Sequence, residues 1–267
     1  MSEDIHDEHH VTSDRAITRW PRTEVAGQTD RGKIRITNED VYALLPSHGV
    51  YLVADGVGGA VAGDVAARLA ANAVGEVFTA PDTITSPDAS APGPLGGLPL
   101  LVNGFHRAQR EVRGAASNDP RKTGMGTTLT AMVVNGATVG IAHIGDSILY
   151  RLRHGSLERL TMEHSVANEL IAAGVMTPER AKVSSYRNLL GRYVGMEGAL
   201  DVETRVDQAM LGDTYLLCTD GLAVVPLEEI AALLDSRSVA SAVSLLIGRA
   251  NRKGAPDNVT AVVVRFA

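Results

Sequence analysis

The chain has 267 residues, of which 45% are hydrophobic and 21% are charged, as in a globular protein with a large core. Its formal net charge of −6 argues against a globally basic surface, and therefore against nucleic acid or anionic lipid as a partner. The single cysteine, Cys218, excludes an intrachain disulfide and a zinc site built from several thiolates.

The start of the chain is polar. Residues 1–14 are acidic and rich in histidine, and they lack the apolar segment of a secretory signal. They predict a disordered tail, followed by a single folded domain over 15–267. Because the chain also lacks a run of about 18 uninterrupted apolar residues, we expect a cytoplasmic protein with no membrane partner.

The first half of the folded part predicts strands, then helices. Apolar and alternating runs indicate the strands, and Ala and Val at helical spacing indicate the helices. A stretch over 79–97, rich in Pro, Ser, Gly and Asp, predicts a surface loop. In order, we expect strands over Ile17–Val25, Val41–Leu45 and Val50–Ala54, and helices over Val61–Phe78 and Leu98–Ala116.

The second half predicts an antiparallel meander followed by further helices and strands. Asn135-Gly136 is a strong hairpin signal, and the irregular polar stretch within 175–198 predicts a flap. We expect strands over Leu129–Val134, Thr138–Ile144, Ile148–Leu152, Leu157–Leu160, Leu200–Val206, Thr214–Cys218 and Val259–Phe266, and helices over Val166–Ala173, Pro178–Val183, Leu227–Leu234 and Ser238–Arg252. Mostly antiparallel strands with helices in two groups predict an α+β fold of two packed sheets flanked by helices.

Four predicted strands carry an aspartate at one end. Asp55, Asp146 and Asp220 follow strands, and Asp257 precedes the last one. One Asp at a strand end is normally just part of a turn. Four of them in one core bring like charges together, and such carboxylates either share protons or bind cations. Oxygen ligands without cysteine favour Mg²⁺ or Mn²⁺, and two such ions typically hold a phosphoryl group and activate water.

Other residues fit a phosphate site. Arg35 can hold two phosphate oxygens at once, although alone it is better explained as a surface residue. The glycines at 56, 58, 59 and 63 match neither a dinucleotide fingerprint nor a P-loop. We interpret them as residues that keep side chains away from an ion site. A cysteine-phosphatase loop is excluded because Val224 occupies the position of its arginine. His143, alone in a strand, predicts a hydrogen-bonded core residue.

With these residues identified, the chain resembles the metal-dependent protein phosphatases of the 2C type, in their bacterial branch. The resemblance covers roughly residues 17–266 and is specific, because several motifs occur in order with compatible spacing. They are Arg35 with Asn38-Glu39-Asp40, Asp55-Gly56-Val57-Gly58-Gly59 with Gly63, Gly126-Thr127-Thr128, Gly145-Asp146-Ser147, Leu160-Thr161 with His164-Ser165, Asn188 through Gly195, Asp220-Gly221, and Asp257-Asn258-Val259-Thr260.

The resemblance implies a four-layer α/β/β/α sandwich with ions at one end and assigns roles to single residues. Asp55 is implied to bridge two ions, the Gly56 carbonyl to bind one, and Asp220 and Asp257 to complete the other. Asp146 resembles the ligand of a third ion, which it shares with Asp220. The remaining roles are phosphate binding by Arg35 and support of metal-bound water or ligands by Glu39, Asp40 and Asn258.

The resemblance also implies a reaction. A hydroxide held between two Mn²⁺ or Mg²⁺ ions attacks the phosphorus of phosphoserine or phosphothreonine directly, without a phosphoenzyme. We expect phosphorylated proteins as substrates, a cognate bacterial kinase as the opposing enzyme, and a monomer. Val57 stands where some relatives carry a histidine as general acid, so the proton donor is open. Ala60, Ile148 and Glu163 also depart from the common bacterial residues, and we expect them to affect specificity before chemistry.

Two alternatives belong to other functional classes. A pseudophosphatase would bind phosphoproteins without turnover, but the complete set of expected carboxylates argues against it. A two-metal phosphodiesterase or nuclease is disfavoured by the acidic charge and by the lack of a basic or aromatic strip.

Overall fold

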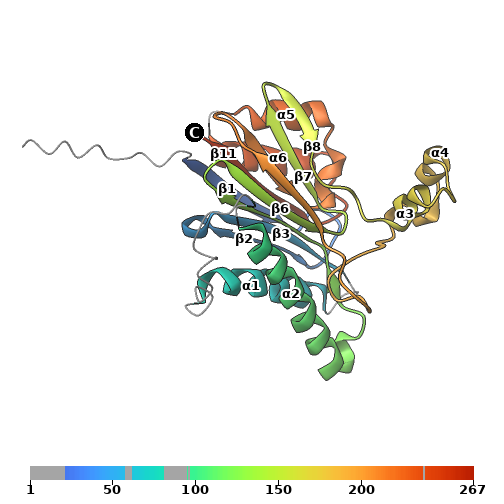
Figure 1. Ribbon diagram of the computed structural model, residues 1–267. Helices are drawn as coiled ribbons and strands as arrows, with labels where there is room; N and C mark the ends of the chain where they lie inside the picture. Colours follow the sequence, from blue (N-terminus) through green and yellow to red (C-terminus); the bar gives the residue numbers. More distant parts are fainter. Residues whose placement is uncertain (1–21, 58–61, 81–94, 96, 237) are drawn as a thin grey trace, which may run out of the picture.

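The structure is a computed structural model that describes residues 22–57, 62–80, 95, 97–236 and 238–267. Two antiparallel sheets pack face to face, and helices cover their outer faces (Figure 1). The predicted four-layer α+β sandwich is therefore confirmed. The predicted tail over 1–14, most of the predicted loop over 79–97, and Gly58, Gly59 and Ala60 lie outside the described residues.

Each sheet mixes strands from distant parts of the chain. The first sheet has, in order, β1 (Thr23–Asp30), β11 (Val259–Phe266), β10 (Thr214–Cys218), β7 (Ile148–Arg153) and β8 (Ser156–Arg159). The second has β2 (Asp40–Leu45), β3 (Val50–Val57), β5 (Leu129–Asn135), β6 (Thr138–Ile144) and β9 (Glu203–Gln208), and the short β4 (Gly126–Thr127) also pairs with β3. Strand-terminal residues far apart in sequence consequently meet at one end of the sandwich.

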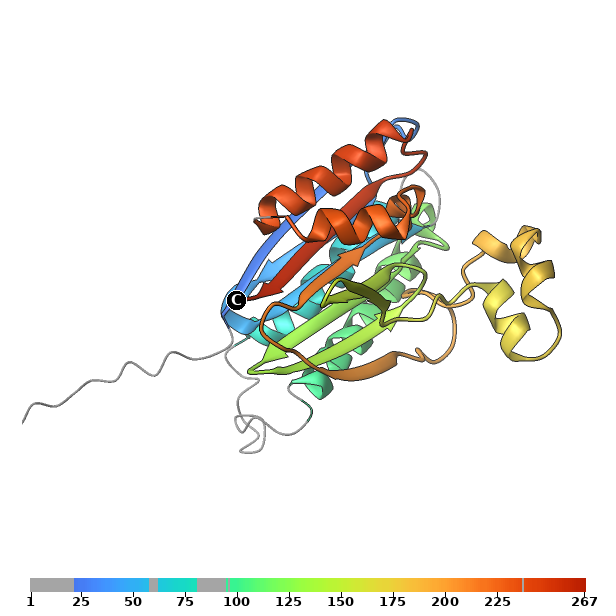
Figure 2. The same ribbon diagram turned by 90° about the horizontal axis from the view of Figure 1, so that it is seen from above.

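Two pairs of helices form the outer layers. α1 (Gly63–Thr79) and α2 (Leu98–Asn118) cover the second sheet, and α5 (Leu227–Leu234) and α6 (Val239–Arg252) cover the first (Figure 2). α3 (Val166–Ala172) and α4 (Pro178–Lys182) stand away from the sandwich in both views. α4 lies within residues 175–198, the predicted flap region, which we call the flap. Short 3-10 turns span Pro46–His48, Pro120–Lys122, Ser185–Asn188 and Asp220–Val224.

The central strands are buried on both faces, which explains their unbroken apolar runs. In β3, Val50 and Leu52 pack against the α1–α2 layer, whereas Tyr51 and Val53 face the other sheet. β11 divides its residues in the same way between α6 and the space between the sheets. This alternation decides which side chains at the strand ends point between the sheets.

Three strands depart most from their predicted bounds. β1 continues to Asp30 because β11 offers it partners from Phe266 to Val259. β9 begins at Glu203 because its register places Gln208 opposite Thr138 of β6. β3 continues past Asp55, since Gly56 and Val57 still pair with β4. Among the described residues, no helix has the length and apolar character needed to cross a membrane.

Candidate metal centre

A cavity of about 740 Å³ opens at the end of the sandwich where β3, β6 and β10 end and β2 and β11 begin. The structure brings all four predicted aspartates together there, with Arg35 among them. The lining residues from the predicted site are Arg35, Glu39, Asp55, Gly56, Asp146, Asp220, Asp257 and Asn258. Asp40 lies behind the lining.

Asp55 lies inside β3, directly opposite Asp40 of β2. Because Tyr51 and Val53 face the other sheet, the alternation of the strand directs Asp55 to the same side. Its backbone is fixed by Thr128, whose hydroxyl accepts from the Asp55 amide at 3.0 Å and whose amide donates to the Asp55 carbonyl at 2.9 Å. Burial, followed by repulsion from Asp40, raises the pKa of Asp55 well above its usual range.

Asp40 is buried, and only one of its two carboxylate oxygens has hydrogen-bond partners among the described residues. Its Oδ2 accepts from the hydroxyls of Thr219 at 2.8 Å and Thr260 at 2.7 Å. Its Oδ1 has no hydrogen-bond partner among the described residues. Burial raises the pKa of Asp40 to about 7, although the two threonine hydroxyls oppose the shift. A buried carboxylate oxygen without a partner is costly, and it indicates that water or a cation belongs beside it.

Asp146 and Asp220 complete the acidic cluster. Asp146 lies in the turn between β6 and β7, and Asp220 follows β10. Burial raises the pKa of Asp146 to about 7, with repulsion from Asp220 as the next cause. Burial also raises the pKa of Asp220 to about 6, with repulsion from Asp257 as the next cause.

Arg35 reaches into this acidic cluster from the loop between β1 and β2. Its Nη2 lies 2.6 Å from Oδ2 of Asp257, and its side chain is about half exposed. Asn258 holds both ends of that loop, because its Nδ2 donates to the carbonyls of Arg31 and Thr37, each at 2.9 Å. Its Oδ1 accepts from the Glu39 amide at 2.9 Å. Asn258 therefore connects the loop that carries Arg35 to the segment that carries Asp257.

The glycines allow backbone segments to approach closely. A Cβ on Gly56 would lie 2.2 Å from the Gly63 carbonyl oxygen, and one on Gly63 would lie 2.4 Å from Oε2 of Glu39. A Cβ on Gly221 would lie 1.9 Å from the Asn258 carbonyl oxygen, so the Asp220 and Asp257 segments touch there. A side chain at any of these glycines would push apart segments that carry site residues.

The chemistry of the donor set fits divalent cations. The candidate donors are carboxylate oxygens of four aspartates, a set that suits Mg²⁺ or Mn²⁺. Burial raises the pKa values of Asp40, Asp55, Asp146 and Asp220, and repulsion within the cluster adds to each shift. Cations would remove that repulsion.

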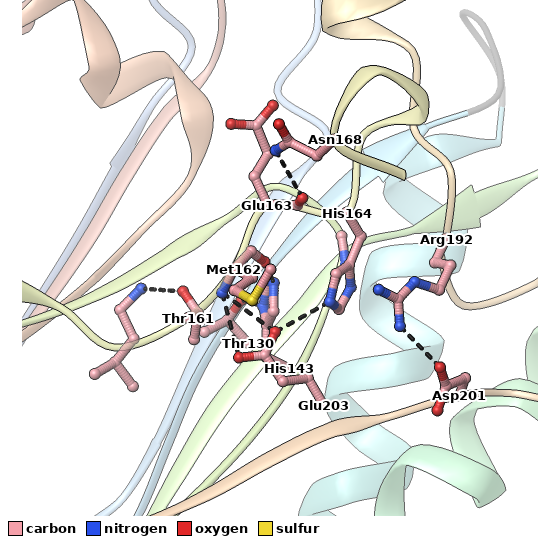
Figure 3. Close-up of polar contacts among 12 residues, drawn as sticks. Thr130, His143, Thr161, Met162, Glu163, His164, Asn168, Arg192, Asp201 and Glu203 are labelled. Carbon is pink, nitrogen blue, oxygen red and sulfur yellow. Dashed lines mark hydrogen bonds and ion pairs between the residues drawn. The ribbon is translucent and has the colours of Figure 1, made fainter. Parts of the chain in front are cut away.

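A second polar cluster joins the segment around His164 to β6 and β9 of the sandwich (Figure 3). His164 is buried; its Nδ1 accepts from the Gly145 amide at 3.2 Å and its Nε2 lies 3.0 Å from Oε2 of Glu203. His143 lies opposite Glu203 in the β6–β9 pairing, and its Nε2 donates to the Met162 carbonyl at 2.7 Å. Sequence reasoning did not single out Glu203, because its role appears only once this register is known.

His143, His164 and Glu203 are close enough together to hold an ion. Their hydrogen bonds argue against one. Nδ1 of His164 must be the acceptor and Nε2 the donor, and Nε2 of His143 must also donate, which leaves Nδ1 to accept from Thr130 at 2.8 Å. No imidazole lone pair is left for a metal. Burial lowers the pKa of His143 to about 3, so it stays neutral. The expectation of a hydrogen-bonded core histidine is confirmed.

His164 also connects the Asp146 turn with the flap. Its amide donates to the Gly145 carbonyl at 2.7 Å, and its own carbonyl accepts from the Gly191 amide at 2.8 Å. Leu190, next to Gly191, lines the metal cavity. One buried histidine therefore fixes the turn that presents Asp146 and the flap segment that faces it.

Cys218 is the last residue of β10 and lies two residues before Asp220. It is buried, and burial raises the pKa of its thiol to about 12. It is a core residue rather than a nucleophile.

Comparison with known proteins agrees with this geometry. Residues 35–263 match the family described as protein phosphatase 2C. The chain is 34% identical to the serine/threonine phosphatase Stp of Listeria welshimeri, over 89% of this chain and 93% of that protein. It is 38% identical to the serine/threonine protein phosphatase PstP of Mycobacterium tuberculosis, over 89% of this chain and 44% of that protein.

A solved structure of the PstP catalytic domain contains two manganese ions. This chain resembles it with a TM-score of 0.77 and 34% identity, over 91% of this chain and 97% of that one. The chain belongs to the protein phosphatase 2C family and is a metal-dependent protein phosphatase of the serine/threonine class. A pseudophosphatase is not favoured.

The clustered carboxylates should make the metal-free protein less stable as the pH rises from about 4 to about 7. Asp40, Asp146 and Asp220 have folded-state pKa values raised to about 7, 7 and 6, so the folded state binds more protons than the unfolded state in that window. Their contribution is therefore greatest in acid and is lost as they ionise. Urea unfolding in chelator across this range measures the effect.

Millimolar Mn²⁺ should restore stability at the upper end of the range, and Asp40→Asn should reduce the pH slope in chelator. Equal slopes for the parent chain and Asp40→Asn would contradict this account of the buried carboxyl.

Two substitutions should separate the two side-chain bonds of His164. His164→Asn keeps an acceptor near the Nδ1 position, whereas His164→Gln keeps a donor near the Nε2 position. Hydrogen exchange at the Gly145 amide should therefore stay slower in the Asn variant, and both variants should lose roughly 1–3 kcal/mol of unfolding free energy. Equal Gly145 exchange in both variants would show that Nδ1 does not hold this turn.

Proposed function

We propose that Asp55, Asp146, Asp220, Asp257 and the Gly56 carbonyl hold the catalytic ions, either Mn²⁺ or Mg²⁺. Two ions would occupy the core of the site, and a third would lie beside Asp146 and Asp220. The observation that carries this proposal is the convergence of four aspartates from separate segments on one cavity. The unpartnered Oδ1 of Asp40 and the raised pKa values support it.

The proposed reaction is hydrolysis of phosphoserine and phosphothreonine in proteins. When bound, the ions would offset phosphate charge and supply a hydroxide nucleophile. Arg35 is the cationic side chain among the described residues that line the cavity, and its fork can bind two phosphate oxygens. Asp257 orients that guanidinium through the 2.6 Å contact. Glu39, Asp40 and Asn258 would support the ligands from outside the ion cluster.

Val57 lines the cavity at the position where a histidine acid stands in some relatives, and it has no proton to give. The leaving oxygen must take its proton from water or from another group of the cavity.

The remaining expectations stay predictions. They are a cognate kinase that phosphorylates the same substrates, a monomeric state, a cytoplasmic location, and one catalytic domain over 15–267. The fold supports the last of these, because both sheets draw strands from both halves of the described chain.

Asp220→Asn should abolish most metal-dependent turnover. The substitution removes a charge that the proposal places on the ions, so phosphate release from a phosphothreonine peptide in millimolar Mn²⁺ should fall by about two orders of magnitude or more. Asp235→Asn, the same change at an exposed aspartate outside the cavity, serves as the control. Turnover that persists after both chelation and Asp220→Asn would contradict the metal mechanism.

Arg35→Ala should weaken phosphate binding more than metal binding. Loss of a bidentate contact to phosphate should raise KM for a phosphopeptide by roughly 10- to 100-fold, while Mn²⁺ affinity measured by calorimetry changes little. Arg110→Ala on the exposed face of α2 is the matched control. A collapse of Mn²⁺ affinity in Arg35→Ala would instead show that Arg35 holds Asp257 in place and has a structural role.

A further inference from the structure

Two isoleucines stand exposed on either side of Arg35 at the mouth of the metal cavity. Ile34 is 71% exposed and Ile36 is 88% exposed, and both line the cavity. Val57 at the end of β3 and Leu190 in the flap also contribute to the lining. An otherwise acidic cavity thus has aliphatic side chains at its entrance.

The exposure belongs to a fixed backbone rather than to a loose loop. Lys33 donates its amide to the Ala255 carbonyl at 2.9 Å, and Asn258 holds the carbonyls of Arg31 and Thr37. Inside the loop, Nη1 of Arg31 donates to the Ile36 carbonyl at 3.2 Å. The loop is therefore hydrogen-bonded at both ends and across its middle, while its two aliphatic side chains face solvent.

Such exposure brings no gain to the folded chain itself. Burying an aliphatic side chain of this size contributes about 1.5–3 kcal/mol, and neither isoleucine receives that contribution from the described residues. Exposed aliphatic groups that gather at a functional cavity typically mark a surface that a partner covers. A peptide that places a phosphorylated residue beside Arg35 brings its neighbouring residues to the same rim, because adjacent Cα atoms are about 3.8 Å apart.

We propose that Ile34 and Ile36, together with Val57 and Leu190 of the same cavity lining, form an apolar rim that binds aliphatic side chains next to the phosphorylated residue of the substrate. This inference rests on the proposed function, since it deepens the description of the same cavity. It assigns the enzyme a class of preferred sites: phosphoserine or phosphothreonine flanked by Leu, Ile or Val rather than by charged or small polar residues.

The test uses three phosphothreonine peptides that differ only in the residues on both sides of the phosphothreonine: Leu, Ser or Glu. With the full chain in millimolar Mn²⁺, kcat/KM should be about tenfold higher for the Leu peptide than for the Ser peptide, and lowest for the Glu peptide. The double variant Ile34→Ser, Ile36→Ser should reduce the Leu-to-Ser ratio to near one. Both positions are solvent-exposed, so the substitutions leave the core packing intact.

Leu211→Ser is the matched control, because Leu211 is 68% exposed and lies outside the metal cavity. It should keep the tenfold ratio. Equal kcat/KM for the Leu and Ser peptides, or a full ratio in the double variant, would overturn the inference. A third outcome would also overturn it: sedimentation detects a dimer of the parent chain, and the double variant is monomeric but keeps the full Leu-to-Ser ratio. A second copy of the chain, and not the substrate, would then cover the isoleucines.

Peptide binding by fluorescence anisotropy separates this inference from the proposed function. If no peptide released phosphate in Mn²⁺, the proposed function would fail, yet the rim would still be supported by tighter binding of the Leu peptide and loss of that preference in the double variant. Equal binding of all three peptides would overturn the rim itself.

Discussion

Repulsion between buried carboxylates is the interaction on which the rest of this structure depends. Several aspartates point into one end of the sandwich, and burial holds their pKa values near neutrality in the absence of bound cations. A fold would not gather these groups without compensation, because each ionisation opposes the next. Thr219 and Thr260 hold the carboxylate of Asp40 through neutral hydroxyls, and Thr128 holds the backbone of Asp55, so the geometry is kept without cancelling the charge. The compensation is left to cations.

The elements around the cavity serve that geometry in different ways. The paired sheets deliver strand ends to one place, and the glycines let these segments touch. Asn258 fastens the loop that carries Arg35 to the start of β11. His164 does the equivalent on the flap side, where it fixes the turn before Asp146 and the chain near Leu190. The acidic cavity, Arg35 and the flap therefore share a small number of polar junctions.

Much of this arrangement could be predicted from the sequence, for physical reasons that differ among the elements. Thr138–Ile144, Thr214–Cys218 and Val259–Phe266 have the predicted bounds because burial on both faces makes each an unbroken apolar run. β9 was misplaced because its mostly exposed, polar residues carry no such signal, and only its pairing with β6 defines its limits.

The aspartates were identifiable because each lies at or near a strand end, a local feature. The junctions were harder to foresee. Glu203 acts on His164 across 39 residues of chain, and Asn258 acts on Arg31 across 227. No local pattern records such contacts. The exposed rim of Ile34 and Ile36 was equally hidden, because in sequence these residues resemble a short strand.

Because this phosphatase is metal-dependent, its reaction does not need a cysteine nucleophile, and Cys218 has no reactive role. Its thiol is enclosed in β10 and stays protonated at any physiological pH, because burial raises its pKa to about 12. Peroxides and electrophiles react with thiolates. This phosphatase therefore offers them no reactive thiolate, and it should keep working under oxidative conditions that inactivate enzymes by oxidising a nucleophilic cysteine.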